Sequence, residues 1–195
     1  MRSERTRLLV EIALTVALSA VLSMLAVRLP INFAGGTVSL SMVPILVLAL
    51  RRGVFPGVIA GVLFGCVDYF IEPFFVAPIQ VLLDYPIAYG AVGLAGLGSA
   101  LYRRSYASSP SKAVAVAIPF IVLGGIGRFV AAWTSGVVFF GQNAPAGQPV
   151  WLYSLLYNLS YIVPSVVLCA AAAAVVLPAL ELAVPSVSRP AGSSV

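Results

Sequence analysis

The stretch VAPIQVLLDYPIAY, residues 76–89, decides the fold, because it places one carboxylate inside an otherwise apolar helical segment. Asp84 lies about a turn and a half into the predicted helix, with Tyr85 beside it and Tyr89 nearby on the helix surface. If this helix crosses a bilayer, the carboxylate lies below the membrane interface, where charged side chains are costly and usually serve function. The alternative is a structural ion pair within the protein, for which Arg128 is the obvious partner.

The composition around this stretch predicts an integral membrane protein. Hydrophobic residues make up 61% of the chain and charged residues only 9%, whereas a soluble domain carries about 25% charged residues. The apolar runs between charges are about 15 to 30 residues long, which suits helices rather than the strands of a barrel. We therefore expect an all-α membrane protein.

Six transmembrane helices account for the apolar runs of this chain, within one membrane domain at 1–184, followed by a flexible tail at 185–195. The expected spans are 8–27, 37–50, 53–71, 76–101, 113–140 and 150–182. The second span is marginal for a hydrocarbon core of ~30 Å. The third carries Gly53, Gly57, Gly61 and Gly65 on one face, which predicts close helix–helix contact.

The basic residues of the predicted loops indicate the orientation. One set of loops and termini holds most of them, namely Arg2, Arg5, Arg7, Arg51, Arg52, Arg103, Arg104, Lys112 and Arg189. The opposite loops hold only Arg28. The positive-inside rule then places both termini in the cytoplasm. It also explains the net charge of +5, so no nucleic-acid partner is needed.

Several chemistries are excluded by what the chain lacks. Histidine is absent, and Cys66 and Cys169 have no metal-ligand spacing, so we expect no metal site, no cofactor and no enzymatic activity. There is no P-loop pattern, which argues against nucleotide hydrolysis by this chain.

Aromatic and polar side chains converge on the outer side in this topology. The candidate ligand-binding residues come from four separate segments: Phe33, Asp84, Tyr85, Trp133, Gly136, Phe140, Tyr153 and Asn158. An aromatic cage with one carboxylate suits a planar ligand that carries a positive charge. No intramembrane proton relay is evident, so the pattern favours a capture protein over a self-sufficient pump.

These residues also lie in motifs of a known family. Their order and spacing resemble the thiamine-specific S-component, or substrate-capture subunit, of energy-coupling factor (ECF) vitamin transporters. The matching motifs are TVSLSMVP at 37–44, LRRG at 50–53, PGVIAG at 56–61, LDY at 83–85, GLAG at 93–96, GVVFFG at 136–141 and YSLLYN at 153–158.

The resemblance implies a six-helix prokaryotic plasma-membrane protein that binds thiamine from outside. It implies that Asp84 contacts the pyrimidine ring, that Tyr153 and Asn158 match the family's tyrosine and asparagine, and that Phe140 replaces its tryptophan. Familiar members carry glutamate at the place of Asp84, and a histidine about where Ala132 stands. Ligand preference therefore stays open between thiamine and another vitamin or a thiamine precursor.

The resemblance further implies docking onto a transmembrane coupling protein with two ATPase subunits. Ala13 and Ala17 lie on one face of the first predicted helix, four residues apart, and small residues at this spacing allow another helix to approach closely. They match the family's docking pair, although ordinary packing within the chain would have the same pattern. Outside this class, the alternatives are a membrane enzyme acting on lipid and an assembly subunit.

Overall fold

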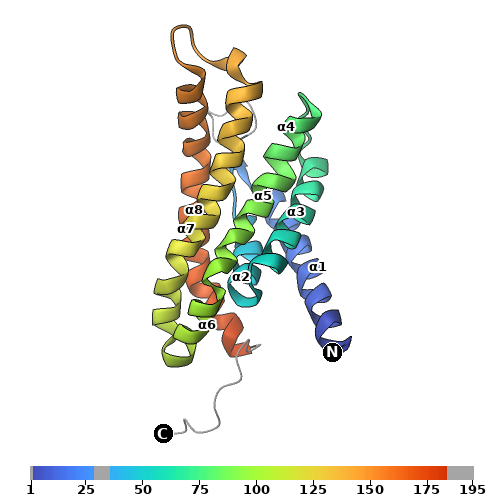
Figure 1. Ribbon diagram of the computed structural model, residues 1–195, viewed down its shortest axis with the longest axis vertical. Coiled ribbons are helices and arrows are strands. Elements are labelled where there is room, and N and C mark those ends of the chain that lie inside the picture. The colour runs from blue at the N-terminus through green and yellow to red at the C-terminus, as the bar shows by residue number, and fades with distance from the viewer. Residues whose placement is uncertain (1, 29–35, 184–195) are drawn as a thin grey trace, which may run out of the picture.

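The computed structural model describes residues 2–28 and 36–183, which form an elongated bundle of helices (Figure 1). The main elements are α1 (Arg2–Met24), α2 (Met42–Arg52), α3 (Val54–Ile71), a continuous helical segment that contains α4 to α6 (Pro78–Ser108), α7 (Pro110–Phe139) and α8 (Val150–Ala183). Two short strands, β1 (Val27–Arg28) and β2 (Thr37–Val38), pair antiparallel. The predicted tail at 185–195 and Phe33 lie outside the described residues.

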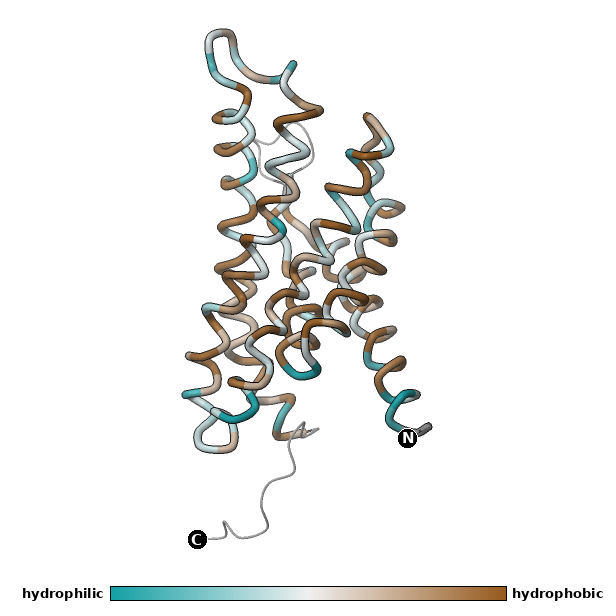
Figure 2. The backbone as a smooth tube through the Cα atoms, viewed as in Figure 1, coloured by the Kyte–Doolittle hydropathy of each residue, from teal (hydrophilic) through white to brown (hydrophobic). Residues whose placement is uncertain are grey.

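Within the described residues, five helices are long and apolar enough to cross a membrane: Glu4–Met24, Val54–Ile71, Pro78–Ser108, Pro110–Phe139 and Val150–Ala183. Hydrophobic residues run along the helices, and hydrophilic ones gather toward their ends (Figure 2). The prediction of an all-helical membrane protein is confirmed.

The second predicted span is not a full crossing. Its helix, α2, has 11 residues, which gives a length of about 16 Å against a hydrocarbon core of ~30 Å. Ile45, Leu46 and Leu50 are fully buried in the hydrophobic core. α2 is therefore enclosed by the other helices, and an apolar sequence alone cannot separate burial in protein from exposure to lipid.

The glycine face of α3 makes the close contact that its spacing predicts. A Cβ added at Gly61 would overlap the Tyr89 carbonyl oxygen, and one at Gly65 would overlap the backbone of Tyr85. α3 therefore lies directly against the helical segment that carries Asp84, with backbone on backbone.

That segment is interrupted where Asp84 stands. α4 (Pro78–Leu82) gives way to a π-helical turn, η1 (Leu83–Ile87), which is followed by α5 (Ala88–Val92), a 3₁₀ turn η2 (Gly93–Gly98) and α6 (Ser99–Ser108). Pro86 has no N–H to donate, so the regular ladder is broken at this point, and the Ala88 N–H instead reaches the Leu83 carbonyl. Single π turns often mark functional sites.

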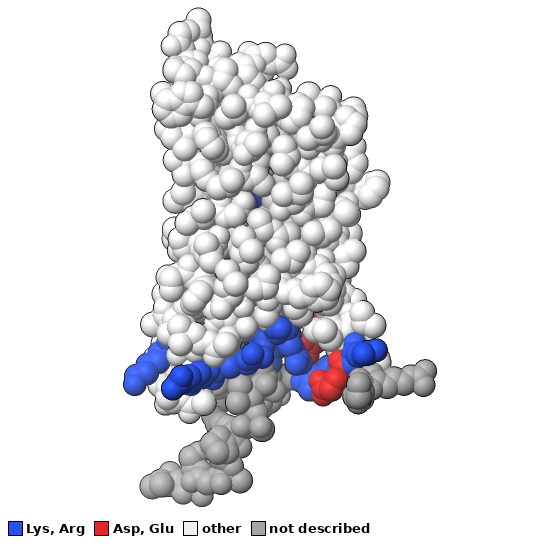
Figure 3. Space-filling model, in the orientation of Figure 1, with Lys and Arg blue, Asp and Glu red and all other residues white. Residues whose placement is uncertain are grey.

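The bundle has one strongly basic end. Lys and Arg side chains gather at the end where α1 begins and α8 ends (Figures 1 and 3). There Arg52 donates from Nε to Glu11 of α1 at 2.7 Å, and Arg51 pairs with Glu181 of α8 at 2.9 Å. Two ion pairs thus fasten the short helix α2 to its longer neighbours.

Candidate ligand-binding site

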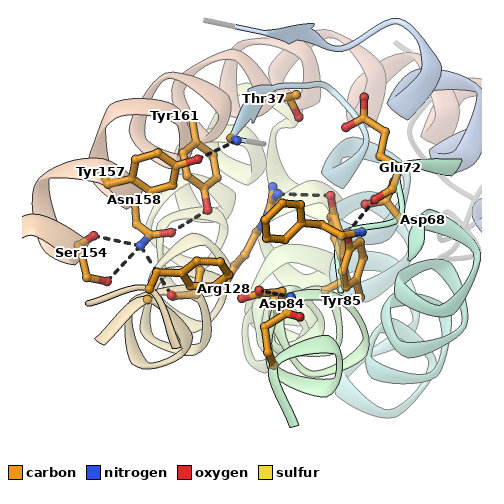
Figure 4. A pocket seen from close by; sticks show the side chains of 18 of the residues that line it. Thr37, Asp68, Glu72, Asp84, Tyr85, Arg128, Ser154, Tyr157, Asn158 and Tyr161 are labelled. Atoms are coloured by element: carbon orange, nitrogen blue, oxygen red, sulfur yellow. Dashed lines mark hydrogen bonds between the residues drawn. The ribbon is translucent and has the colours of Figure 1, made fainter. Parts of the chain in front are cut away.

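A cavity of about 580 Å³ opens at the end of the bundle opposite the basic one. Its volume falls in the range of about 300–1,000 Å³ that is typical of small-molecule sites. The lining comes from the start of β2, from α3 and the turn after it, from α4 to α5, from α7 and the segment after it, and from α8. Figure 4 shows the α8 side chains on one side and Asp68, Glu72 and Tyr85 on the other.

Asp84 lines this cavity in a fixed orientation. Its Oδ2 accepts a hydrogen bond of 2.6 Å from Nε2 of Gln80, one helical turn earlier. Gln80 is fully buried, and its Oε1 accepts from the Val76 N–H at 3.0 Å. Asp84 is thus held by the helix on which it stands.

Asp84 forms no ion pair with Arg128, so that alternative is wrong. The Arg128 Nη2 donates to the Tyr89 hydroxyl at 3.1 Å, and the guanidinium lies 4.4 Å from the centre of the Tyr89 ring. Its Nη1 has no hydrogen-bond partner. Tyr89 lies about one turn beyond Asp84, and it is Tyr89, not the Asp84 carboxylate, that contacts the guanidinium.

A further carboxylate of the cavity, Asp68, was missed by the sequence analysis. It is 8% exposed, lines the cavity, and accepts a short hydrogen bond from the Ser23 hydroxyl of α1. The available signal was its position near the end of an apolar run, where any carboxylate is unusual. With Glu72 and Asp84 it gives the lining three acidic side chains against the single guanidinium of Arg128, so the cavity favours a cation.

The α8 wall is aromatic and held by internal hydrogen bonds. The rings of Tyr153 and Tyr157 stack with centroids 6.0 Å apart. Asn158 donates from Nδ2 to the Ser154 carbonyl at 2.8 Å and accepts from the Tyr161 hydroxyl at 2.6 Å (Figure 4). Asn158 therefore lies at the cavity as expected, but its amide already braces α8.

On α7, the cavity is lined by Ala132 and Gly136, one turn apart, and Phe140 lines it directly after the helix ends. The Phe140 ring lies 5.8 Å from that of Phe74. Trp133 is not among the lining residues, because one residue further along a helix turns the side chain by about 100°. Its indole N–H donates to the Trp151 carbonyl at 3.0 Å.

Tyr85 connects the cavity to the turn between α3 and α4. Its ring lines the cavity, while its hydroxyl donates to the Glu72 carbonyl at 2.6 Å and accepts from the Phe74 N–H at 3.1 Å. Tyr85 therefore fixes the turn between α3 and α4.

The structure thus brings six of the eight predicted site residues to one cavity: Asp84, Tyr85, Gly136, Phe140, Tyr153 and Asn158. Ala13 and Ala17 lie apart from it, exposed on α1. Within residues 2–28 and 36–183, no group of three or more His, Cys, Asp or Glu side chains is placed to hold a metal ion.

Apolar helices around a polar, acidic and aromatic cavity define a multi-pass membrane protein with a small-molecule binding site. Comparison with known proteins specifies the class. A family model described as thiamine transporter protein matches residues 9–184. The chain belongs to this family, which consists of transporters rather than enzymes, and it is a multi-pass protein of the bacterial plasma membrane.

Individual relatives agree. The chain is 37% identical over 164 residues to the thiamine transporter ThiT of Bacillus subtilis (strain 168). The matched region covers 83% of this chain and 85% of the relative. It is 38% identical over 122 residues to ThiT of Lacticaseibacillus paracasei, covering 60% and 61% of the two chains. The solved structure of ThiT from Listeria monocytogenes superposes with a TM-score of 0.82 at 26% identity, covering 90% of this chain and 96% of that one.

Proposed function

We propose that the cavity binds thiamine with high affinity and that the chain is the substrate-capture subunit of an ECF transporter. The observation that carries this proposal is the acidic, aromatic-walled cavity in a chain of the thiamine transporter family. Thiamine joins an aminopyrimidine to a permanently cationic thiazolium ring. Its two planar rings and its charge match the stacking surfaces and the acidic excess of the lining.

Asp84 is proposed as the polar anchor of the pyrimidine. Its Oδ2 accepts from Gln80. Oδ1 accepts none of the hydrogen bonds found among the described residues, and the buried Ser135 hydroxyl, which has no partner of its own, lies near the carboxylate. Oδ1 can accept from the exocyclic amine of the ligand. The rings of Phe140 and Tyr153 supply stacking, and Asn158 holds the α8 wall in place.

The proposed topology places both termini in the cytoplasm and opens the cavity to the outside. Its support is the basic end of the bundle, opposite the cavity (Figure 3), which the positive-inside rule assigns to the cytoplasm. Five helices cross the membrane, and the sixth, α2, lies enclosed among them.

Energy for uptake is proposed to come from a coupling protein with two ATPase subunits that docks on α1. Ala13 and Ala17 are exposed on this helix, together with Leu14 and Leu18. Small residues there let a partner helix approach closely. Because the sequence carries no P-loop, a partner has to hydrolyse the nucleotide.

Another vitamin or a thiamine precursor is the second candidate, because Ala132 lines the cavity where familiar members carry histidine. Calorimetric titration of the purified protein with thiamine, with its isolated pyrimidine precursor and with other vitamins separates the two. We expect saturable binding that is tightest for thiamine. Tighter binding of the precursor or of another vitamin would replace thiamine as the ligand.

A further inference from the structure

We propose that Gln80 is a positioning residue that orients Asp84 and so makes the site select an amino group over a carbonyl group on the ligand ring. This inference rests on the proposed function, since it concerns the same cavity and the same anchor. Gln80 lies in the cavity lining and was not among the residues predicted from sequence.

The orientation of the Gln80 amide is fixed by its two partners. The Val76 N–H is a donor, so the atom that faces it at 3.0 Å is the acceptor Oε1. Nε2 then faces Asp84 and donates to Oδ2 at 2.6 Å. Exchanging oxygen and nitrogen would place donor against donor at Val76 and acceptor against acceptor at Asp84, so the amide has one workable orientation.

This arrangement assigns different tasks to the two oxygens of Asp84. Oδ2 is engaged by Gln80, whereas Oδ1 carries none of the hydrogen bonds found in the described part of the chain. Since an ionised carboxylate is only an acceptor, a ligand group that meets Oδ1 has to be a donor. An exocyclic amine satisfies this requirement, and a carbonyl at the same place is repelled.

The hydrogen bond from Gln80 to Asp84 matters because the helix is irregular at Asp84. Asp84 stands in the π-helical turn η1, directly after the regular turns of α4, where the hydrogen-bond ladder shifts by one residue. Gln80 is fully buried and bridges the two helix types. Without Nε2, the Asp84 carboxylate loses the hydrogen bond that fixes its direction and that favours its ionised, acceptor-only form. A protonated carboxyl group could donate to a carbonyl, so the preference for an amino group would narrow.

The test compares thiamine with its analogue in which a carbonyl replaces the pyrimidine amino group. Binding of both compounds is measured by calorimetry for the parent, Gln80→Met, Asp84→Asn and the double variant. We expect Gln80→Met to weaken thiamine binding by about tenfold, the order of one hydrogen bond to a charged group. We also expect it to narrow the preference for thiamine over the analogue.

The double variant separates positioning from a structural role. If Gln80 acts through Asp84, Gln80→Met adds no further loss in the Asp84→Asn background, because the asparagine is then free to turn its amide oxygen toward the ligand. Independent structural damage would instead multiply with the loss from Asp84→Asn. Gln80→Leu likewise removes the donor to Asp84. It serves as the second variant if Gln80→Met fails to fold.

The outcomes distinguish this inference from the proposed function. If the folded parent protein does not bind thiamine, the proposed function fails. If the parent binds thiamine, but a folded Gln80 variant keeps the full preference over the carbonyl analogue, or its loss multiplies with that of Asp84→Asn, Gln80 does not position Asp84.

Discussion

Replacing Asp84 by Asn tests the proposed anchor with almost no change in shape. In the parent, Gln80 donates to Oδ2 at 2.6 Å, so the asparagine has to turn its carbonyl oxygen toward Gln80. Its amide nitrogen then faces the cavity, where donor meets donor at the exocyclic amine of thiamine. One hydrogen bond to a charged group, worth about 1.5–3 kcal/mol, is lost.

That free energy corresponds to a loss of affinity of roughly tenfold to a hundredfold. Calorimetry is the appropriate assay, because Trp133 is not in the lining and its fluorescence is not a direct probe of the cavity. Asp84→Glu is the matched control, since it keeps the charge and restores the acid found in familiar members of the family. We expect Asp84→Glu to retain binding, and thermal unfolding should show that both variants are folded.

A folded Asp84→Asn protein that binds thiamine as tightly as the parent would remove Asp84 from the site. Arg128 does not complicate this experiment, because its guanidinium donates to the Tyr89 hydroxyl, at 3.1 Å, and not to Asp84. We therefore expect no uncompensated cation in Asp84→Asn.

Three further predictions concern topology, packing and docking. With the exposed Cys66 replaced by Ala, a membrane-impermeant thiol reagent on intact cells should label a cysteine at Gln142 but not one at Ser108, and the reverse pattern would invert the topology. Gly61→Val should lower the unfolding temperature, because its side chain would overlap the Tyr89 backbone and overpacking costs about 1–3 kcal/mol; an unchanged temperature would contradict this helix contact. Ala17→Trp should leave thiamine binding intact and abolish co-purification with a coupling module, whereas loss of binding would place α1 in the site.

The sequence was sufficient where composition or spacing has a single physical meaning. A chain with 9% charged residues cannot cover a water-facing surface, so membrane helices followed directly. The spacing of Gly57, Gly61 and Gly65 predicted a close helix contact, and Gly61 and Gly65 lie against the backbone of the next helix. Gly53 does not share this role, because it lies between α2 and α3 with a φ of 101°.

The sequence was insufficient where the answer depends on which way a helix faces. Ala132 and Trp133 are neighbours, yet only Ala132 lines the cavity, and the apolar sequence of α7 does not encode that rotation. The π-helical turn at Leu83–Ile87 likewise changes the directions of the side chains around it. The predicted depths of Asp84 and Arg128 in the membrane allowed an ion pair between them. In the structure, Arg128 instead donates to the Tyr89 hydroxyl and lies over its ring.

Asp68 was overlooked for a related reason. A carboxylate near the end of an apolar run reads equally well as the solvated boundary of a span or as a buried group. Asp68 accepts a hydrogen bond from Ser23, which lies on α1, 45 residues away in sequence. A local sequence pattern cannot predict such a contact. Burial of Asp68 is therefore a tertiary property, although it adds to the acidic character of the site.

The most direct test of the central claim is to identify the small molecule that the protein itself retains. The protein is purified in detergent from cells grown with thiamine, and the denatured sample is analysed by mass spectrometry, with Asp84→Asn purified in parallel. The account predicts thiamine in the parent sample, close to one molecule per chain, and a clearly lower amount in Asp84→Asn. A different compound in the parent, or equal thiamine in both samples, would contradict the assignment of this cavity as a thiamine site anchored by Asp84.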